Sequence, residues 1–167
     1  RFDVQLNLVP FDPSFIPTTC FRPRFYLPIP TVTPIKNGML TVAGDIRRQL
    51  DLPDLNQVGF VVRSMERALA LYEPLFGPFS TMDPGPMTYD YRGAQEECNM
   101  RLAFGKSGDV EIELIEWVSG GCPHKEFLDA GREGMHHLRF IVDDLDTQVA
   151  AAQSVGLSRL RFQTRMH

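Results

Sequence analysis

The sequence is poor in the features that mark disulfide-rich and membrane-spanning proteins. Its three cysteines, Cys20, Cys98 and Cys122, are an odd number at wide spacings. They exclude a full disulfide framework and a zinc site built from cysteines, and they favour a reducing compartment. No stretch approaches the roughly 18 apolar residues that a bilayer-spanning helix needs. No charged segment followed by an apolar one marks a signal peptide. We therefore expect a cytoplasmic protein with no membrane partner.

Basic charge is also scarce, and it is scattered along the chain. The 167 residues include 17 Lys and Arg against 21 Asp and Glu, which gives a net charge of −4. A nucleic-acid-binding protein must neutralise many phosphates, so this balance argues against that class. The hydrophobic fraction of 43% is ordinary for a globular protein. The length fits one domain or two small modules that share a core.

Proline is concentrated at the start of the chain, where eight of the 13 prolines precede residue 54. Proline cannot donate to a β-ladder and fixes φ, so residues 1–53 are interpreted as an extended arm, either a packing tail or a linker. Residues 2–9 and 25–32 could still form edge strands, and residues 46–50 a short helix. We assign residues 54–167 to a folded domain: module one at 54–118, a linker at 119–134, and a partial module two at 135–167.

Module one shows clear strand and helix signals. Residues 57–63 form a β-branched-rich strand, and Ser64 is a suitable N-cap. Apolar residues then recur at helical spacing until Gly77, which is expected to adopt the left-handed C′ conformation before Pro78. Three further strands are predicted at 88–92, 99–104 and 110–117, the last two joined by a hairpin turn. The order is strand, helix, strand, strand, strand.

The start of this pattern returns 80 residues later. Residues 137–142 form a strand, Asp143 and Asp144 supply capping carboxylates, and a helical stripe ends at Gly156. Strand length, cap position and apolar phase all match, which indicates an internal duplication. A short helix is also expected near residues 126–130. The sequence therefore predicts an α+β fold in which paired βαβββ modules form a curved mixed sheet around a cavity.

The duplication places Gln57 and His137 at equivalent strand positions. Because side chains alternate faces along a strand, both point away from the helix that follows, as does Arg139. In strand 110–117 the same alternation buries three residues under the helices and sends four to the other face. Those four are Glu111, Glu113, Ile115 and Trp117. Gln, Glu and His on one concave face suit a divalent transition metal.

The segment of residues 134–145 (GMHHLRFIVDDL) resembles the hallmark segment of methylmalonyl-CoA epimerases. Residues 57–77 resemble the opening strand and helix of the vicinal oxygen chelate superfamily, and residues 110–117 its second ligand strand. This resemblance implies a divalent metal, Zn, Ni, Co or Mn, held by Gln57, Glu113 and His137. Epimerases usually have His at the first position, whereas eukaryotic glyoxalase I begins with Gln.

Two departures from the family leave the site incomplete. The fourth family ligand lies on a final strand that this chain does not reach before His167. Asn99 falls roughly where epimerases carry a catalytic Glu, with Glu96 and Glu97 nearby. Glu113 and Glu97 are therefore the candidate catalytic residues.

Other side chains receive weaker assignments. Arg139, Tyr91 and Trp117 are candidates for substrate binding. His136 is interpreted as structural, since strand phase points it away from His137. Cys122 and His124 are interpreted as incidental loop residues.

One N-terminal segment could replace the missing strand. Residues 3–9 (DVQLNLV) repeat the residue types of residues 109–115 (DVEIELI). We hypothesise that the N-terminal strand fills the vacant slot, in this chain or in a partner chain, so that Gln5 or Asn7 approaches the metal position. A truncated C-terminus is the alternative.

The resemblance implies an isomerase or epimerase that transfers a proton next to a carbonyl group. Its small-molecule substrate would be acyl-CoA-like or derived from an α-oxo-aldehyde. A glyoxalase-type lyase or a dioxygenase of the same superfamily is an alternative. So is a metal-free binding protein of the same fold. Open sheet edges favour a homodimer.

Overall fold

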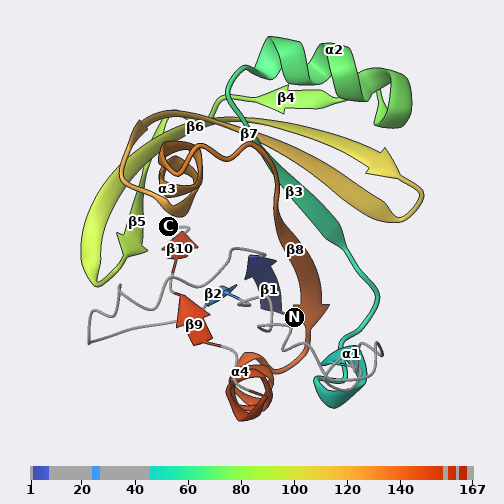
Figure 1. Cartoon of the computed structure of the whole chain (residues 1–167), viewed down its shortest axis with the longest axis vertical. Helices are drawn as coiled ribbons and strands as arrows, with labels where there is room; N and C mark the ends of the chain where they lie inside the picture. Colours follow the sequence, from blue (N-terminus) through green and yellow to red (C-terminus); the bar gives the residue numbers. More distant parts are fainter. Residues whose placement is uncertain (1, 8–23, 27–45, 156–157, 161, 165–167) are drawn as a thin grey trace, which may run out of the picture.

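The computed structural model describes residues 2–7, 24–26, 46–155, 158–160 and 162–164. Its centre is one mixed, strongly curved sheet in the order β10-β5-β6-β7-β3-β8-β1-β2-β9, with β4 added on β6. The two ends of this path, β10 and β9, do not pair with each other within the described residues, so the sheet stays unclosed. Figure 1 shows how the sheet curls around an interior. The predicted α+β fold class, with a curved mixed sheet, is confirmed.

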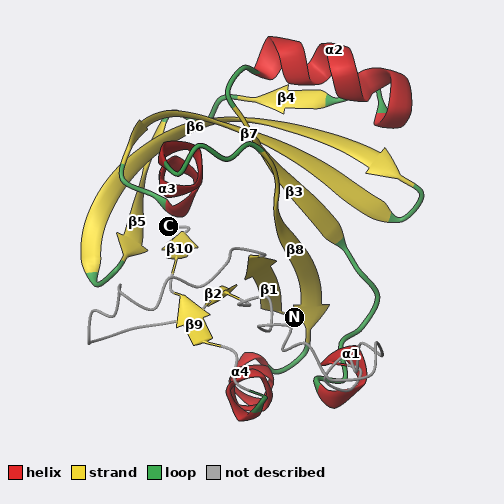
Figure 2. Cartoon of the chain, in the orientation of Figure 1, coloured by secondary structure: helices red, strands yellow, loops and turns green. Residues whose placement is uncertain are grey.

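Module one has the predicted order with one addition. It comprises β3 (Gln57–Val62), α2 (Met65–Phe76), β4 (Ser80–Met82), β5 (Pro86–Tyr91), β6 (Ala94–Ser107) and β7 (Val110–Gly120). β3 and β7 pair in parallel, whereas β5, β6 and β7 form an antiparallel meander. The helix α2 lies on the outer face of the sheet (Figure 2), where Met65, Ala68 and Leu114 share a buried cluster.

Both ends of α2 follow from local chemistry. Ser64 is the N-cap, and its Oγ accepts a hydrogen bond from the backbone N of Arg67 over 3.3 Å. The prediction for Gly77 is wrong, because this residue is extended, with φ −71° and ψ 175°. The following Pro78 has no backbone N–H to donate, so the helix cannot continue through it.

The second half repeats the strand and helix of module one. It comprises α3 (Pro123–Asp129), β8 (Gly134–Val142), α4 (Leu145–Ser154), β9 (Ser158–Leu160) and β10 (Phe162–Thr164). Asp144 caps α4 by accepting from the backbone N–H groups of Asp146 and Thr147. These hydrogen bonds, with that of the Thr147 hydroxyl as the largest contribution, lower the pKa of Asp144. The expected helix stop at Gly156 lies outside the described residues.

The N-terminal part contributes β1 (Phe2–Asn7), β2 (Arg24–Tyr26) and α1 (Ile46–Gln49). β1 pairs with β8 from Phe2 opposite Val142 to Asn7 opposite His137. It therefore occupies the position beside β8 that the sequence suggested. It runs antiparallel to β8, whereas β7 runs parallel to β3, so the match between residues 3–9 and 109–115 does not extend to strand direction. Residues 8–9 lie outside the described part.

The concave side of the sheet is filled at one end by α3. Val61, Met100 and Ile115 of the sheet are buried together with Phe127 and Leu128 of α3. Figure 1 shows α3 inside the curve of β5, β6 and β7. None of the helices in the described ranges has the length and apolar run that a bilayer crossing requires.

Candidate metal site

Two rows of residues cross the concave face, because β6, β7, β3 and β8 pair in register. The first row consists of Phe104, Glu113, Gly59 and His137. The second row consists of Lys106, Glu111, Gln57 and Arg139. Residues two apart on a strand share a face, so the two rows lie next to each other. The sequence placed Gln57, Glu113, His137 and Arg139 on one face, and the strand register agrees.

A chain of hydrogen bonds holds the second row in place. Gln57 is fully buried, and its Nε2 donates to Glu111 Oε1 over 2.7 Å. The same oxygen accepts from Arg139 Nη2 over 3.0 Å, while Arg139 Nε donates to Asn56 Oδ1 over 2.9 Å. These bonds orient both the amide and the guanidinium. Gln57 Oε1 is buried, and it has no hydrogen-bond partner in the described part of the chain.

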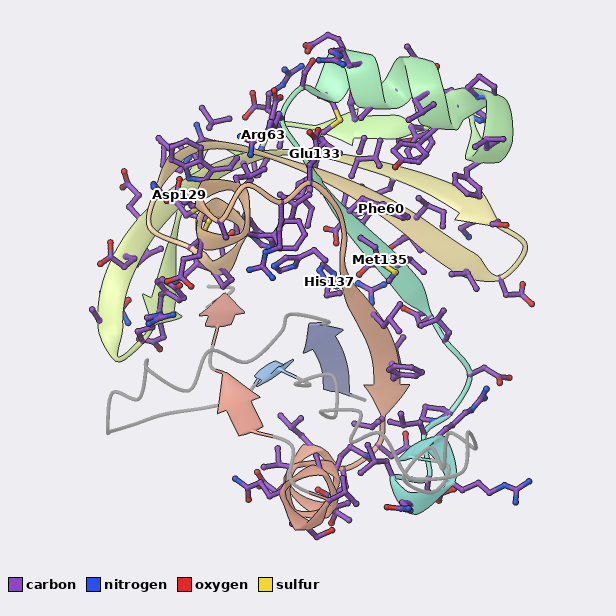
Figure 3. The ribbon with its side chains drawn as sticks, viewed as in Figure 1. Phe60, Arg63, Asp129, Glu133, Met135 and His137 are labelled. Carbon is purple, nitrogen blue, oxygen red and sulfur yellow. The ribbon has the colours of Figure 1, made fainter. Side chains whose placement is uncertain are left out.

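In the first row, Glu113 and His137 meet over Gly59. His137 Nε2 lies 3.4 Å from Glu113 Oε2, and the ring is only 1% exposed. Figure 3 shows the His137 side chain on β8. A Cβ on Gly59 would lie 2.1 Å from Cε1 of His137. The imidazole thus fills the space that any other side chain at position 59 would take. A glycine inside a strand is the sequence signal for such a close approach.

The prediction that His136 points away from His137 is wrong. A β-bulge interrupts the pairing of β3 with β8, since Gly59 pairs with His137 but Phe60 pairs with Met135. His136 is the extra residue, and regular alternation of faces is lost there. As a result, Nδ1 of His136 lies 3.2 Å from Nδ1 of His137, with both rings 1% exposed.

The helix α3 brings a third imidazole to this pair. His124 lies in its first turn and is 4% exposed, with its ring centroid 4.9 Å from that of His136. One ligand nitrogen from each of His124, His136 and His137 lies within 4.8 Å of the others, a spacing that could hold a metal ion. Sequence reasoning had set His124 and Cys122 aside as incidental loop residues. The structure makes Cys122 the N-cap of α3 and His124 part of a histidine cluster.

Tyr91 and Trp117, the candidates for substrate binding, pack at the end of the concave face that α3 covers. Tyr91 is buried, and burial, with Glu126 as the next cause, raises the pKa of its hydroxyl. Trp117 is half-buried against the same cluster, and its Nε1 donates to the carbonyl of Gly120 over 2.9 Å. Neither residue belongs to the two rows, whereas Arg139 does.

The structure does not bring Glu97 to the rows. Glu97 is exposed near the start of β6, seven residues before Phe104. At about 3.3 Å per residue, this separation corresponds to roughly 20 Å along the strand. Asn99 and Glu96 lie at the same end of β6. Of the two candidate catalytic carboxylates, only that of Glu113 lies beside His137.

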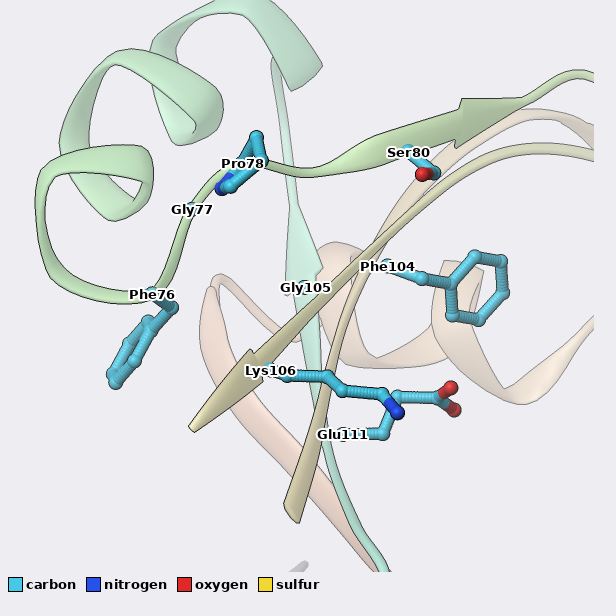
Figure 4. Close-up of a pocket in the computed structure, with 8 residues that line it drawn as sticks. All are labelled: Phe76, Gly77, Pro78, Ser80, Phe104, Gly105, Lys106 and Glu111. Carbon is cyan, nitrogen blue, oxygen red and sulfur yellow. The ribbon is translucent and has the colours of Figure 1, made fainter. Parts of the chain in front are cut away.

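A groove opens at the Lys106 end of the second row (Figure 4) and has a volume of about 390 Å³. Its lining residues are Phe76, Gly77, Pro78, Ser80, Phe104, Gly105, Lys106 and Glu111. Glu111 both lines the groove and holds Gln57. The volume is in the range of small-molecule sites, so the groove could hold a ligand beside the rows.

Comparison with known families agrees with this architecture. Residues 56–164 match the family described as the glyoxalase/bleomycin resistance protein/dioxygenase superfamily. The match covers more than half of the chain, and the chain belongs to this superfamily.

A curated relative is similar over part of its length. The uncharacterized protein YqjC of Bacillus subtilis is 29% identical over 97 residues, which are 58% of this chain and 63% of that protein. The alignment with this chain thus spans less than two thirds of its curated relative.

Two solved structures are similar to part of this chain. A hypothetical protein from Bacillus halodurans has 23% identity and a TM-score of 0.43, covering 62% of this chain and 68% of that one. Methylmalonyl-CoA epimerase from Mycobacterium tuberculosis has 22% identity and a TM-score of 0.44, covering 63% of this chain and 65% of that one. Similarity at this level carries no argument about the chemistry of the site.

Proposed function

We propose that this chain is a metal-dependent enzyme that transfers a proton at the carbon next to a carbonyl group, as an isomerase or epimerase. One observation supports this most directly: the Glu113 carboxylate and the His137 imidazole meet at 3.4 Å over Gly59. The buried Gln57 amide lies in the adjacent row. The proposed substrate is a small acyl-CoA-like compound or an adduct of an α-oxo-aldehyde.

These residues fit a divalent metal ion. Gln57 Oε1 and His137 Nε2 are buried, and neither atom has a hydrogen-bond partner among the described residues. An unsatisfied buried polar atom costs about 1–3 kcal/mol, and coordination to an ion would remove that cost. A carboxylate, an amide oxygen and an imidazole suit Zn²⁺, Ni²⁺, Co²⁺ or Mn²⁺. We propose that Gln57, Glu113 and His137 hold this ion.

When bound, a divalent ion would supply Lewis-acid polarisation of the substrate carbonyl, worth several kcal/mol. Glu113 is the candidate base that accepts the proton from the adjacent carbon. Arg139 is held by Glu111 and Asn56, and a guanidinium has five N–H donors. Its remaining donors would bind a substrate carboxylate or phosphate through charge-assisted hydrogen bonds.

Proton exchange at the substrate carbon tests this function. The protein is incubated in D₂O with branched acyl-CoA esters or hemithioacetals, after loading with each of the four metals. Deuterium incorporation next to the carbonyl is followed by NMR. We expect exchange with the wild type and a loss of about 100-fold or more for Glu113→Gln, the range of a missing acid–base group.

The matched control is Glu116→Gln. Glu116 lies on the same strand as Glu113 but on the outer face, where it pairs with Arg101 at 2.9 Å. This variant should exchange protons at the wild-type rate. Metal content by plasma mass spectrometry, for the wild type and His137→Ala, completes the test.

A wild type with neither metal uptake nor exchange would contradict the enzyme proposal. The alternative function, a metal-free binding protein, would then be tested by measuring whether the same compounds raise the melting temperature. Turnover without exchange would indicate the lyase or dioxygenase alternative.

A further inference from the structure

We infer that His124, His136 and His137 form a second metal site, made of three imidazoles, that binds a transition-metal ion such as Zn²⁺. It shares only His137 with the set of Gln57, Glu113 and His137, and it does not depend on the proposed activity. The sequence alone assigned no metal-binding role to its other two residues, His124 and His136.

The distances fit a single ion. Zinc–nitrogen bonds of 2.0–2.1 Å in a tetrahedral site place two ligand nitrogens about 3.3 Å apart. The two Nδ1 atoms of His136 and His137 are 3.2 Å apart. One ligand nitrogen from each of His124, His136 and His137 lies within 4.8 Å of the others, so a shift of the His124 ring completes the set.

The local fold brings the three rings together by two separate features. The bulge in β8 places the consecutive residues His136 and His137 on one side, which a regular strand would not do. The first turn of α3 brings His124 against them. The Phe127 ring meets the His136 ring edge-on, with centroids 5.0 Å apart, and holds its orientation.

Glu113 has a defined role at this second site. A neutral imidazole has one donor and one acceptor nitrogen, so an ion on Nδ1 of His137 leaves the proton on Nε2. That nitrogen lies 3.4 Å from the Glu113 carboxylate. A carboxylate behind a metal-bound histidine is a common arrangement that fixes the tautomer and raises the basicity of the ligand. Glu113 is then a positioning residue.

The two sites use opposite nitrogens of His137. A neutral imidazole has only one nitrogen without a proton, so one ion is bound at a time. Ligand type separates them, since imidazoles suit Zn²⁺, Ni²⁺ and Cu²⁺ while oxygen-rich sets suit Mn²⁺. We therefore assign Zn²⁺ to the three imidazoles and, of the four metals proposed above, Mn²⁺ to the set of Gln57, Glu113 and His137.

Zinc binding and X-ray absorption test this assignment. Metal-stripped wild type, His124→Gln and Gln57→Leu are titrated with Zn²⁺ against a chromophoric chelator. The number of imidazole ligands is counted at the zinc edge. We expect one Zn²⁺ and three imidazoles in the wild type. His124→Gln should bind at least tenfold more weakly with two imidazoles, and Gln57→Leu should match the wild type.

His136→Gln provides a second variant with the same expected loss, and circular dichroism shows whether each variant is folded. Wild-type affinity in folded His124→Gln and His136→Gln would overturn the assignment. Zinc bound by a single imidazole in the wild type, together with weaker binding in Gln57→Leu, would also overturn it. That result would support an ion held by Gln57, Glu113 and His137. A wild type that takes up no Zn²⁺ overturns it as well, and proton exchange with Mn²⁺ then tests the proposed activity alone.

Discussion

At Gly59, the backbone of β3 passes directly beneath the His137 ring, with Glu113 on the neighbouring strand. Both proposed metal sites use His137, so both depend on the space that this glycine leaves. The imidazole is 1% exposed, so protein atoms enclose it on its other sides as well. One hydrogen atom in place of a side chain therefore sets the position of the shared ligand.

Substitution Gly59→Ala should disturb this ligand directly. The new Cβ would lie 2.1 Å from Cε1 of His137, so the ring must shift. Overpacking of this kind costs about 1–3 kcal/mol of unfolding free energy, and we expect metal affinity to fall with it. Urea denaturation and zinc titration measure the two effects. Gly121→Ala is the control, because the nearest atoms to its Cβ would belong to the end of the flexible Glu96 side chain, at 3.1 Å. Unchanged stability and affinity in Gly59→Ala would contradict the prediction.

Strand alternation was enough to predict which residues share the concave face, including Gln57, Glu113 and Arg139. It failed at His136, because the bulge arises from pairing with β3, which lies about 80 residues earlier in the chain. His124 was missed for a related reason, since only the packing of α3 brings it to the strand.

At the scale of elements, α2 is the helix that the described part of module one contains. Its apolar side covers the outer face of β6 and β7, and Ser64 satisfies one of the backbone N–H groups of its first turn. The helix α2 therefore packs on the outer face of β6 and β7, and the inner face of the same strands contributes residues to the two rows of the candidate site.

We predict that Ser64→Ala destabilises the protein by about 1 kcal/mol, the usual cost of losing an N-cap. The hydrogen bond from Arg67 N to Ser64 Oγ, 3.3 Å long, is lost in this variant. Chemical denaturation measures the change, with the exposed Ser107→Ala as control. Equal midpoints for Ser64→Ala and the wild type would show that water replaces the cap.

Elements with periodic apolar residues were predictable, such as β3, α2 and β8. The strand β4 was not, because Ser80, Thr81 and Met82 are all exposed and show no apolar alternation. Strands β6 and β8 also extend beyond their predicted bounds, because backbone pairing continues past the apolar core. The extra residues of β8 include the bulge.

At the scale of the whole molecule, β1 brings the N-terminal part of the chain into the same sheet as the second half. It makes β8 an internal strand, flanked by β3 on one side and β1 on the other. Its backbone extends both rows by one strand, since Gln5 pairs with Arg139 and Asn7 pairs with His137. Whether the Gln5 or Asn7 side chain contributes a ligand stays a prediction, as do the homodimer and the cytoplasmic location.

Deletion of residues 1–7 should turn β8 into an edge strand. We expect faster amide hydrogen exchange across residues 137–142, which lose their ladder partner, and a greater tendency to self-associate. Exchange in the β6–β7 hairpin should be unchanged, because β1 does not pair with it. Hydrogen-exchange mass spectrometry compares the two regions, and equal protection of residues 137–142 would contradict the pairing.

The sheet also has a consequence for protein synthesis. The β1 strand leaves the ribosome before its partner β8, which follows roughly 130 residues later. At 5–20 residues per second, translation of that interval takes on the order of ten seconds. During this time β1 lacks its partner β8, so the backbone N–H and C=O groups on that side of the strand stay unpaired. The β1 strand, which precedes the other described elements in the chain, must therefore wait for β8 before this part of the sheet can form.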